Sequence, residues 1–92
     1  MKKSDLKNGM VVKLRDDSLM MVVDNMLIEI NSNLSLNDYS DTLEFYDAEV
    51  YDIVAIYEQA KERGFVFSDL SDKNYSYLKL IWKRVEVELT EE

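Results

Sequence analysis

The chain of 92 residues contains no cysteine, no histidine and no proline, and it has only two glycines. Without cysteine it can form neither a disulfide nor a thiolate metal site, and a reducing intracellular setting fits. Without histidine it lacks the commonest general base and the commonest transition-metal ligand. No apolar run approaches the ~20 residues that cross a bilayer. We therefore expect one cytoplasmic domain over residues 1–92, not bound to a membrane, in which residues 86–92 form a frayed tail.

Basic residues are also absent from the middle of the chain. Eleven carboxylates and no Lys or Arg lie from Asp16 to Glu58. The first fifteen residues carry five bases and one acid, and residues 59–92 carry six bases and seven acids. The net charge of −8 therefore arises in the middle segment. Such segregation creates a local field that attracts or repels partners, although it does not select a fold.

The N-terminal third has the pattern of a strand meander. Asn8-Gly9 and Asp24-Asn25 suit tight turns, because these residues tolerate positive φ. Polar residues alternate with β-branched and other apolar ones between the turns. The expected strands are Met10–Arg15, Leu19–Val23 and Met26–Ile30.

The rest of the chain is less regular. Residues 31–50 show no clean period, and we expect a short helical turn near Leu34–Tyr39 whose leucines plug the open end of the sheet. The segment Asp52–Gly64 fits either a strand through Tyr57, followed by a helical turn, or a helix over residues 52–63. Tyr77–Arg84 is the last expected strand, and Val85–Leu89 could prolong it.

Five short strands predict a mainly β fold, a small SH3-like barrel or half-open roll with a short helical turn. The alternative is an α+β fold with a helix over residues 52–63 lying on the sheet. Trp82 alternates with charged residues on its strand and is expected in the core. A shallow aromatic groove for an extended peptide, shared by Trp82, Tyr57, Tyr75 and Tyr77, is the other reading.

Several segments together resemble a known family. They are Leu6–Val12, the meander that follows it, Asp52–Tyr57 and Leu80–Arg84. In this order and spacing they resemble small SH3-barrel-like proteins encoded by phages and prophages of Gram-positive bacteria. The chain departs from that family at Gln59–Lys73 and at Val85–Glu92. The resemblance implies a mobile genetic element as the setting, and it transfers no catalytic residue.

An acidic and aromatic stretch between Asp38 and Asp52 is the candidate site. Carboxylates recur there every two or three residues with aromatic residues between them. Such a surface can bind arginine through ion pairs and cation–π contacts. The simpler interpretation is a solvated surface that only keeps the protein soluble. The predicted partner-binding residues are Asp38, Tyr39, Asp41, Glu44, Tyr46, Asp47, Glu49 and Asp52.

The expected function is non-catalytic binding of a protein partner with a basic surface. The alternative is an acidic, nucleic-acid-mimicking inhibitor of a host nucleic-acid enzyme or defence nuclease, of the anti-CRISPR or anti-restriction type. Five bases beside eleven acids argue against direct nucleic-acid binding. The basic N-terminus could instead pair with the acidic segment, within one chain or between copies. A homodimer formed when Val85–Leu89 adds to a neighbour's sheet edge also stays open.

No motif indicates chemistry. Asp38-x-x-Asp41-x-x-Glu44 lacks the pattern of an EF-hand loop, although a weak surface Ca²⁺ or Mg²⁺ site there stays open. No glycine-rich phosphate loop exists, because Gly9 and Gly64 stand alone. Nothing activates the serines or singles out a pair of carboxylates. We therefore expect neither an enzyme nor a cofactor.

Overall fold

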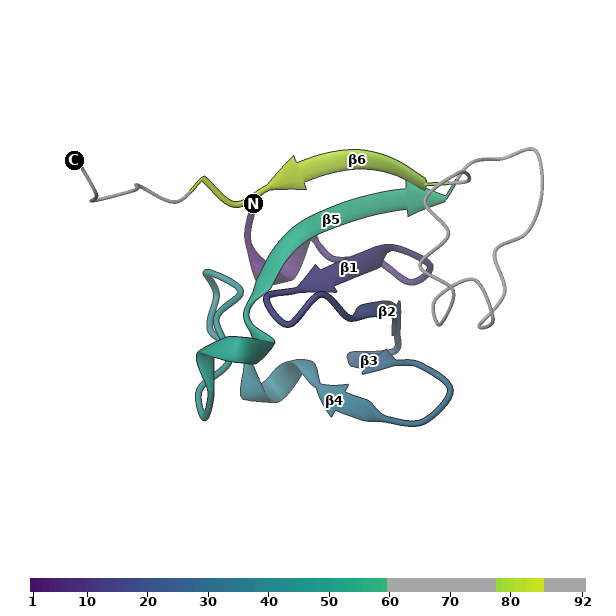
Figure 1. The fold of residues 1–92 in the computed structure, drawn as a ribbon. Helices are drawn as coiled ribbons and strands as arrows, with labels where there is room; N and C mark the ends of the chain where they lie inside the picture. Colours follow the sequence, from purple (N-terminus) through teal and green to yellow (C-terminus); the bar gives the residue numbers. More distant parts are fainter. Residues whose placement is uncertain (60–77, 86–92) are drawn as a thin grey trace.

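The computed structural model describes residues 1–59 and 78–85. It is mainly β: six antiparallel strands form one open sheet in the order β4-β3-β2-β1-β5-β6, from the bottom to the top of Figure 1. The helical elements in the described ranges are short 3-10 turns, η1 (Lys3–Asp5), η2 (Leu36–Asp38) and η3 (Glu49–Tyr51). The strands are β1 (Val11–Leu14), β2 (Leu19–Val23), β3 (Met26–Ile28), β4 (Asn33–Ser35), β5 (Ile53–Gln59) and β6 (Leu78–Lys83).

The predicted meander is confirmed. Strands β1, β2 and β3 pair in sequence, with Val12 opposite Met20 and Val22 opposite Leu27. The turn between β2 and β3 has φ of 47° at Asp24 and 68° at Asn25. Two consecutive residues with positive φ match the twist of the flanking strands, and for this reason Asp-Asn serves well here.

Strand β4 was not predicted. Its three residues pair with β3, Leu34 facing Leu27, where only a helical turn was expected. A strand this short, with Asn33 and Ser35 on either side of one leucine, has too few positions to show a period. The helical turn itself is confirmed as η2, which begins after Ser35, whose Oγ accepts a hydrogen bond from the N–H of Asn37 at 3.1 Å.

Strand β5 resolves the ambiguous segment. Residues 53–59 are extended and lie between β1 and β6, so the helical alternative is wrong there. Residues 60–63, and with them most of the expected helical turn, lie outside the described residues. Within this strand Ile53, Ala55 and Ile56 are buried. The β-branched run Ile53–Val54 and Ile56 suits that environment.

The C-terminal predictions are only partly covered. Strand β6 ends at Lys83, one residue before the expected end, and Val85 lies beyond it. The apolar patch at 65–67, the loop after it, and the prolongation and tail over 86–92 lie outside the described residues.

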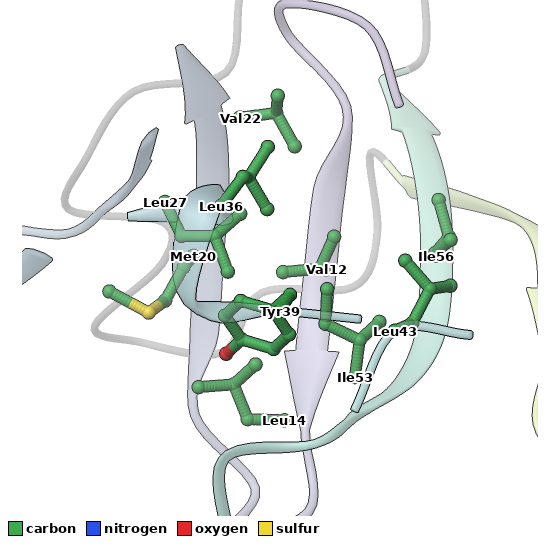
Figure 2. Packing of buried hydrophobic residues seen from close by; sticks show 10 residues of the cluster. All are labelled: Val12, Leu14, Met20, Val22, Leu27, Leu36, Tyr39, Leu43, Ile53 and Ile56. Atoms are coloured by element: carbon green, nitrogen blue, oxygen red, sulfur yellow. The ribbon is translucent and has the colours of Figure 1, made fainter. Parts of the chain in front are cut away.

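One face of the sheet carries the main core. Side chains from β1, β2, β3 and β5 meet three residues of the long connection between β4 and β5, namely Leu36, Tyr39 and Leu43, all at most 4% exposed (Figure 2). Ile81 and Trp82 pack against this cluster while partly exposed. Trp82 therefore belongs to the rim of the core. The chain folds its irregular connection back over the sheet because strands alone would leave this face open to water.

The opposite face buries a smaller cluster. Val11 and Leu19 are almost fully buried there, with Met21, Tyr57 and Leu78 packed against them. Tyr57 thus lies on one face, whereas Trp82, paired with Ile56, lies on the other. These two rings cannot share the aromatic groove considered above, and Tyr75 and Tyr77 lie outside the described residues. Within 1–59 and 78–85, no helix combines the length and the apolar character needed to cross a bilayer.

Candidate functional site

The acidic loop, residues 38–52, runs from the end of η2 to the start of β5. Its first part is a hairpin: the N–H of Tyr46 donates to Asp38 O at 2.9 Å, and the N–H of Ser40 donates to Glu44 O at 2.8 Å. At the tip Leu43 has φ of +71°, a backbone conformation that residues other than glycine rarely adopt. Its side chain is fully buried in the core, and this burial offsets the backbone strain.

Tyr39 is a correction to the predicted contact residues. Its side chain is fully buried, and its hydroxyl donates to Tyr51 O at 2.7 Å. The ring meets Phe45 edge-on at 5.1 Å. Burial, reinforced by the nearby Asp52 carboxylate, raises the pKa of the Tyr39 phenol far above its ordinary value. Tyr39 is a structural plug with a satisfied hydroxyl, so it cannot touch a partner.

Asp52 is the second correction. It is only 4% exposed, and its two carboxylate oxygens have separate internal partners. Oδ1 accepts from the N–H of Phe45 at 2.9 Å, and Oδ2 accepts from Arg15 Nη2 at 3.2 Å. Arg15 also donates its backbone N–H to Asp52 O at 2.8 Å. Asp52 therefore clasps the loop to the sheet, and the expected pairing of an N-terminal base with the acidic segment occurs here.

Two further cations hold the backbone of the acidic loop without neutralising its carboxylates. Lys3 Nζ donates to Tyr39 O at 2.8 Å and to Leu36 O at 3.1 Å. Arg84, just after β6, donates through Nη2 to Thr42 O and Ile53 O, each at 2.9 Å. Its guanidinium lies 5.5 Å from the centre of the Trp82 ring. These side chains give hydrogen-bond donors to backbone carbonyls in and next to the loop, and they tie the loop to η1 and to the end of β6.

The other six predicted residues are exposed: Asp38, Asp41, Glu44, Tyr46, Asp47 and Glu49. The ion pairs found in the described part of the chain are Lys13–Asp17 and Arg15–Asp52, and neither involves these carboxylates. Glu44 Oε1 accepts from Thr42 Oγ1 at 3.0 Å, which orients one of them. The hairpin brings Asp38 opposite Tyr46 and holds Glu44 beside its tip, while Asp47 and Glu49 follow between the hairpin and β5.

Exposed apolar side chains accompany these acids. Tyr46 is 68% exposed, Val50 49% and Tyr51 37%. The ring of Tyr51 packs edge-on against Phe45 at 5.4 Å, and this contact holds it in place. The predicted contact residues include neither Val50 nor Tyr51, although Tyr51 is one of the aromatic residues between the acids of this stretch. Both residues lie in the short turn η3, which contains no buried residue.

The arrangement does not suit metal chemistry. Among residues 1–59 and 78–85, no three carboxylates converge in a way that could hold a metal ion. What the acidic loop can do chemically is to offer carboxylate oxygens and ring faces to cationic groups.

Comparison of the chain with protein-family models, with curated protein sequences and with solved structures found no match.

Proposed function

We propose that the protein is a non-catalytic binding protein, which captures a protein partner with a basic surface through the exposed part of the acidic loop. One observation carries this: carboxylates without an ion pair in the described residues stand beside three exposed apolar side chains on one firmly held loop. The resemblance to small phage and prophage proteins supports a cytoplasmic role for it in a mobile genetic element.

A surface that only improved solubility would avoid exposed apolar groups. Seven large apolar residues are exposed in the described part of the chain, and three of them lie between Tyr46 and Tyr51. Aromatic residues are enriched at the centres of protein interfaces, and exposed apolar groups that cluster mark contact sites. The combination favours binding over a merely solvated surface.

The internal hydrogen bonds of the loop also matter for affinity. Its backbone is held by hydrogen bonds from four side chains, those of Tyr39, Asp52, Lys3 and Arg84. A loop that is already ordered loses little conformational entropy when it binds, so more of the interaction energy contributes to affinity. The carboxylates steer a cationic partner toward the surface, and the aromatic rings keep it there.

The test is capture of partners from a host lysate at low and moderate salt, with identification by mass spectrometry. The variant Asp41→Lys/Asp47→Lys should lose the captured protein while the fold is kept, because neither carboxylate has a hydrogen bond or an ion pair with a described residue. The matched control is Asp24→Lys/Glu58→Lys, which changes the net charge by the same amount outside the loop. Equal capture by both variants would refute the proposal.

A second candidate is a nucleic-acid mimic that inhibits a host nucleic-acid enzyme. The observation in its favour is the spacing of exposed carboxylates along a fixed backbone, because enzymes of this kind bind rows of phosphates through Lys and Arg. Duplex DNA should then compete with the protein for the captured partner, and capture should weaken steeply with salt. If DNA does not affect capture, the nucleic-acid mimic is refuted and binding of a basic protein partner is the remaining candidate.

A further inference from the structure

The outer edge of β6 is a second surface that can bind. The inner side of this strand pairs with β5 through five residue pairs, from Ala55–Lys83 to Gln59–Leu78. No strand in the described ranges pairs with its outer side, and β6 ends the sheet at the top of Figure 1. Such an edge offers backbone N–H and C=O groups that can pair with another extended chain.

A bulge in β6 determines which side chains border this edge. Trp82 pairs with Ile56 and Leu80 pairs with Tyr57, so Ile81 is an extra residue. Ile81 and Trp82 both pack against the main core. Leu80, 49% exposed, is consequently left on the opposite face together with Lys83, which stands opposite the buried Ala55.

This face of β6 borders a hollow of about 400 Å³. Its apolar lining comes from Leu14, Val54, Ala55, Tyr57 and Leu80. A second bulge, between Lys13 and Leu14 in the β1–β5 pairing, places both Val54 and Ala55 on this side. Four of the residues around the hollow are basic and one is acidic, so the hollow is locally positive in a chain of net charge −8.

We propose that the outer edge of β6 binds an extended acidic segment of another protein by strand addition. Backbone hydrogen bonds hold the added strand, and its carboxylates meet the ammonium groups of Lys79 and Lys83 on the two faces. Both lysines are exposed, and neither forms an ion pair with a described residue. An apolar side chain of the added strand would cover Leu80 beside the hollow.

The charge of the edge argues against a second copy as the occupant. Pairing of two β6 strands would bring Lys79 and Lys83 of both copies to one shared edge, with no carboxylate in β6 to meet them, and like charges close together repel. The lysines are not merely a guard against aggregation either. A guarded edge avoids exposed apolar residues, whereas this one shows Leu80 and, just past its end, Val85 at 92% exposed.

The surface is independent of the acidic loop, since it uses none of that loop's exposed residues. Its test therefore does not depend on the function proposed above. The probe is a short fluorescent peptide in which Glu and Thr alternate, titrated with the full chain at low ionic strength and followed by anisotropy. Saturable binding is expected, and amide resonances of residues 78–85 should shift most.

Three controls make the test decisive. A peptide with Lys in place of Glu should not bind, and a Glu–Thr peptide with alternate backbone nitrogens methylated should not bind either. Lys83→Glu should weaken binding by about fivefold or more, from the loss of one close charge pair. Lys7→Glu, an equal charge change at an exposed position away from β6, should leave binding unaltered.

Each alternative outcome would overturn the inference. Equal binding of the methylated peptide would show that charge alone attracts the probe and that no strand is added. A dimer in sedimentation experiments whose contacts map to β6 would assign the edge to a second copy. Absence of saturable binding, with the thermal transition of the chain intact, would show that the edge is not a binding surface.

Discussion

The acidic loop and strand β6 present opposite charges, and they are built in opposite ways. In β6 the regular ladder with β5 satisfies the backbone, and the side chains are placed by alternation interrupted by one bulge. In the acidic loop a short hairpin satisfies only part of the backbone, and side chains, chiefly those of Asp52, Lys3 and Arg84, satisfy further groups. A surface loop outside regular structure thus requires polar residues that point inward. Two of the eight residues predicted to touch a partner, Tyr39 and Asp52, point inward and support the loop.

Tyr39 should make the largest contribution to stability. Tyr39→Ala should lower the free energy of unfolding by about 4 kcal/mol, because a large buried ring is lost from beneath the loop. Thermal or denaturant unfolding measures this, and Leu80→Ala on β6, which removes a half-exposed side chain, is the comparison. Equal effects of the two substitutions would contradict the structural role of Tyr39.

Asp52 should be next. Asp52→Ala removes the acceptor for both the Phe45 N–H and Arg15, and we expect a loss of about 2 kcal/mol. Arg15 is one-third exposed, so water screens part of the effect. Asp52→Asn should recover part of the loss, since the amide oxygen can still accept from Phe45. No difference between the alanine and asparagine variants would argue against the clasp.

The phenol of Tyr39 predicts a dependence on alkaline pH. Its pKa is raised in the folded state, so the fold favours the protonated form. The stabilisation is complete below the ordinary pKa of 10.0 and is lost as pH rises above it, by about 1.4 kcal/mol per pH unit. Unfolding of the wild type and of Tyr39→Phe between pH 8 and pH 11 tests this. The variant should lose less stability as pH rises, and parallel curves would contradict the assignment.

Arg84 joins the two regions, because it directly follows β6 and its side chain donates hydrogen bonds to the acidic loop. Arg84→Lys keeps the charge but loses the planar donors that reach Thr42 O and Ile53 O together. We expect a loss of about 1 kcal/mol of stability. Amide hydrogen exchange should rise in the acidic loop and stay slow in β1 and β2. Faster exchange spread over the whole sheet would show that Arg84 does not act on the loop in particular.

The exposed carboxylates should matter least for stability. Asp41→Asn/Asp47→Asn should change the free energy of unfolding by no more than about 0.5 kcal/mol, because neither side chain has a contact in the described residues. The same variant should reduce partner capture. A marked loss of stability would show that these residues stabilise the fold, as Tyr39 and Asp52 do.

Prediction from sequence succeeded where a local pattern suffices. Asp24-Asn25 and the alternation on each side of it predicted the meander, since both turn and strand preferences are local. It failed for β4, whose three residues are extended because β3 offers them a partner. For β5 the pattern left two readings open, and the neighbouring strands decided between them.

For the candidate site, the pattern of acids and aromatic rings predicted a contact surface but did not show that two of its residues, Tyr39 and Asp52, point inward. Tyr39 and Tyr46 each stand next to an aspartate in the sequence, yet Tyr39 is buried and Tyr46 is 68% exposed. Residue type cannot separate them, because the difference arises from the hairpin register that pairs Asp38 with Tyr46.

The sequence by itself determined the charge of each segment, the first three strands and the lack of thiol and imidazole chemistry. These follow from residue identity and from neighbours along the chain. Folding in three dimensions determined which acids face water, that Asp52 pairs with Arg15, and that the outer edge of β6, bordered by lysines, has no partner strand among the described residues. Burial and pairing depend on segments far apart in sequence, and their geometry exists only after the connection between β4 and β5 has folded over the sheet.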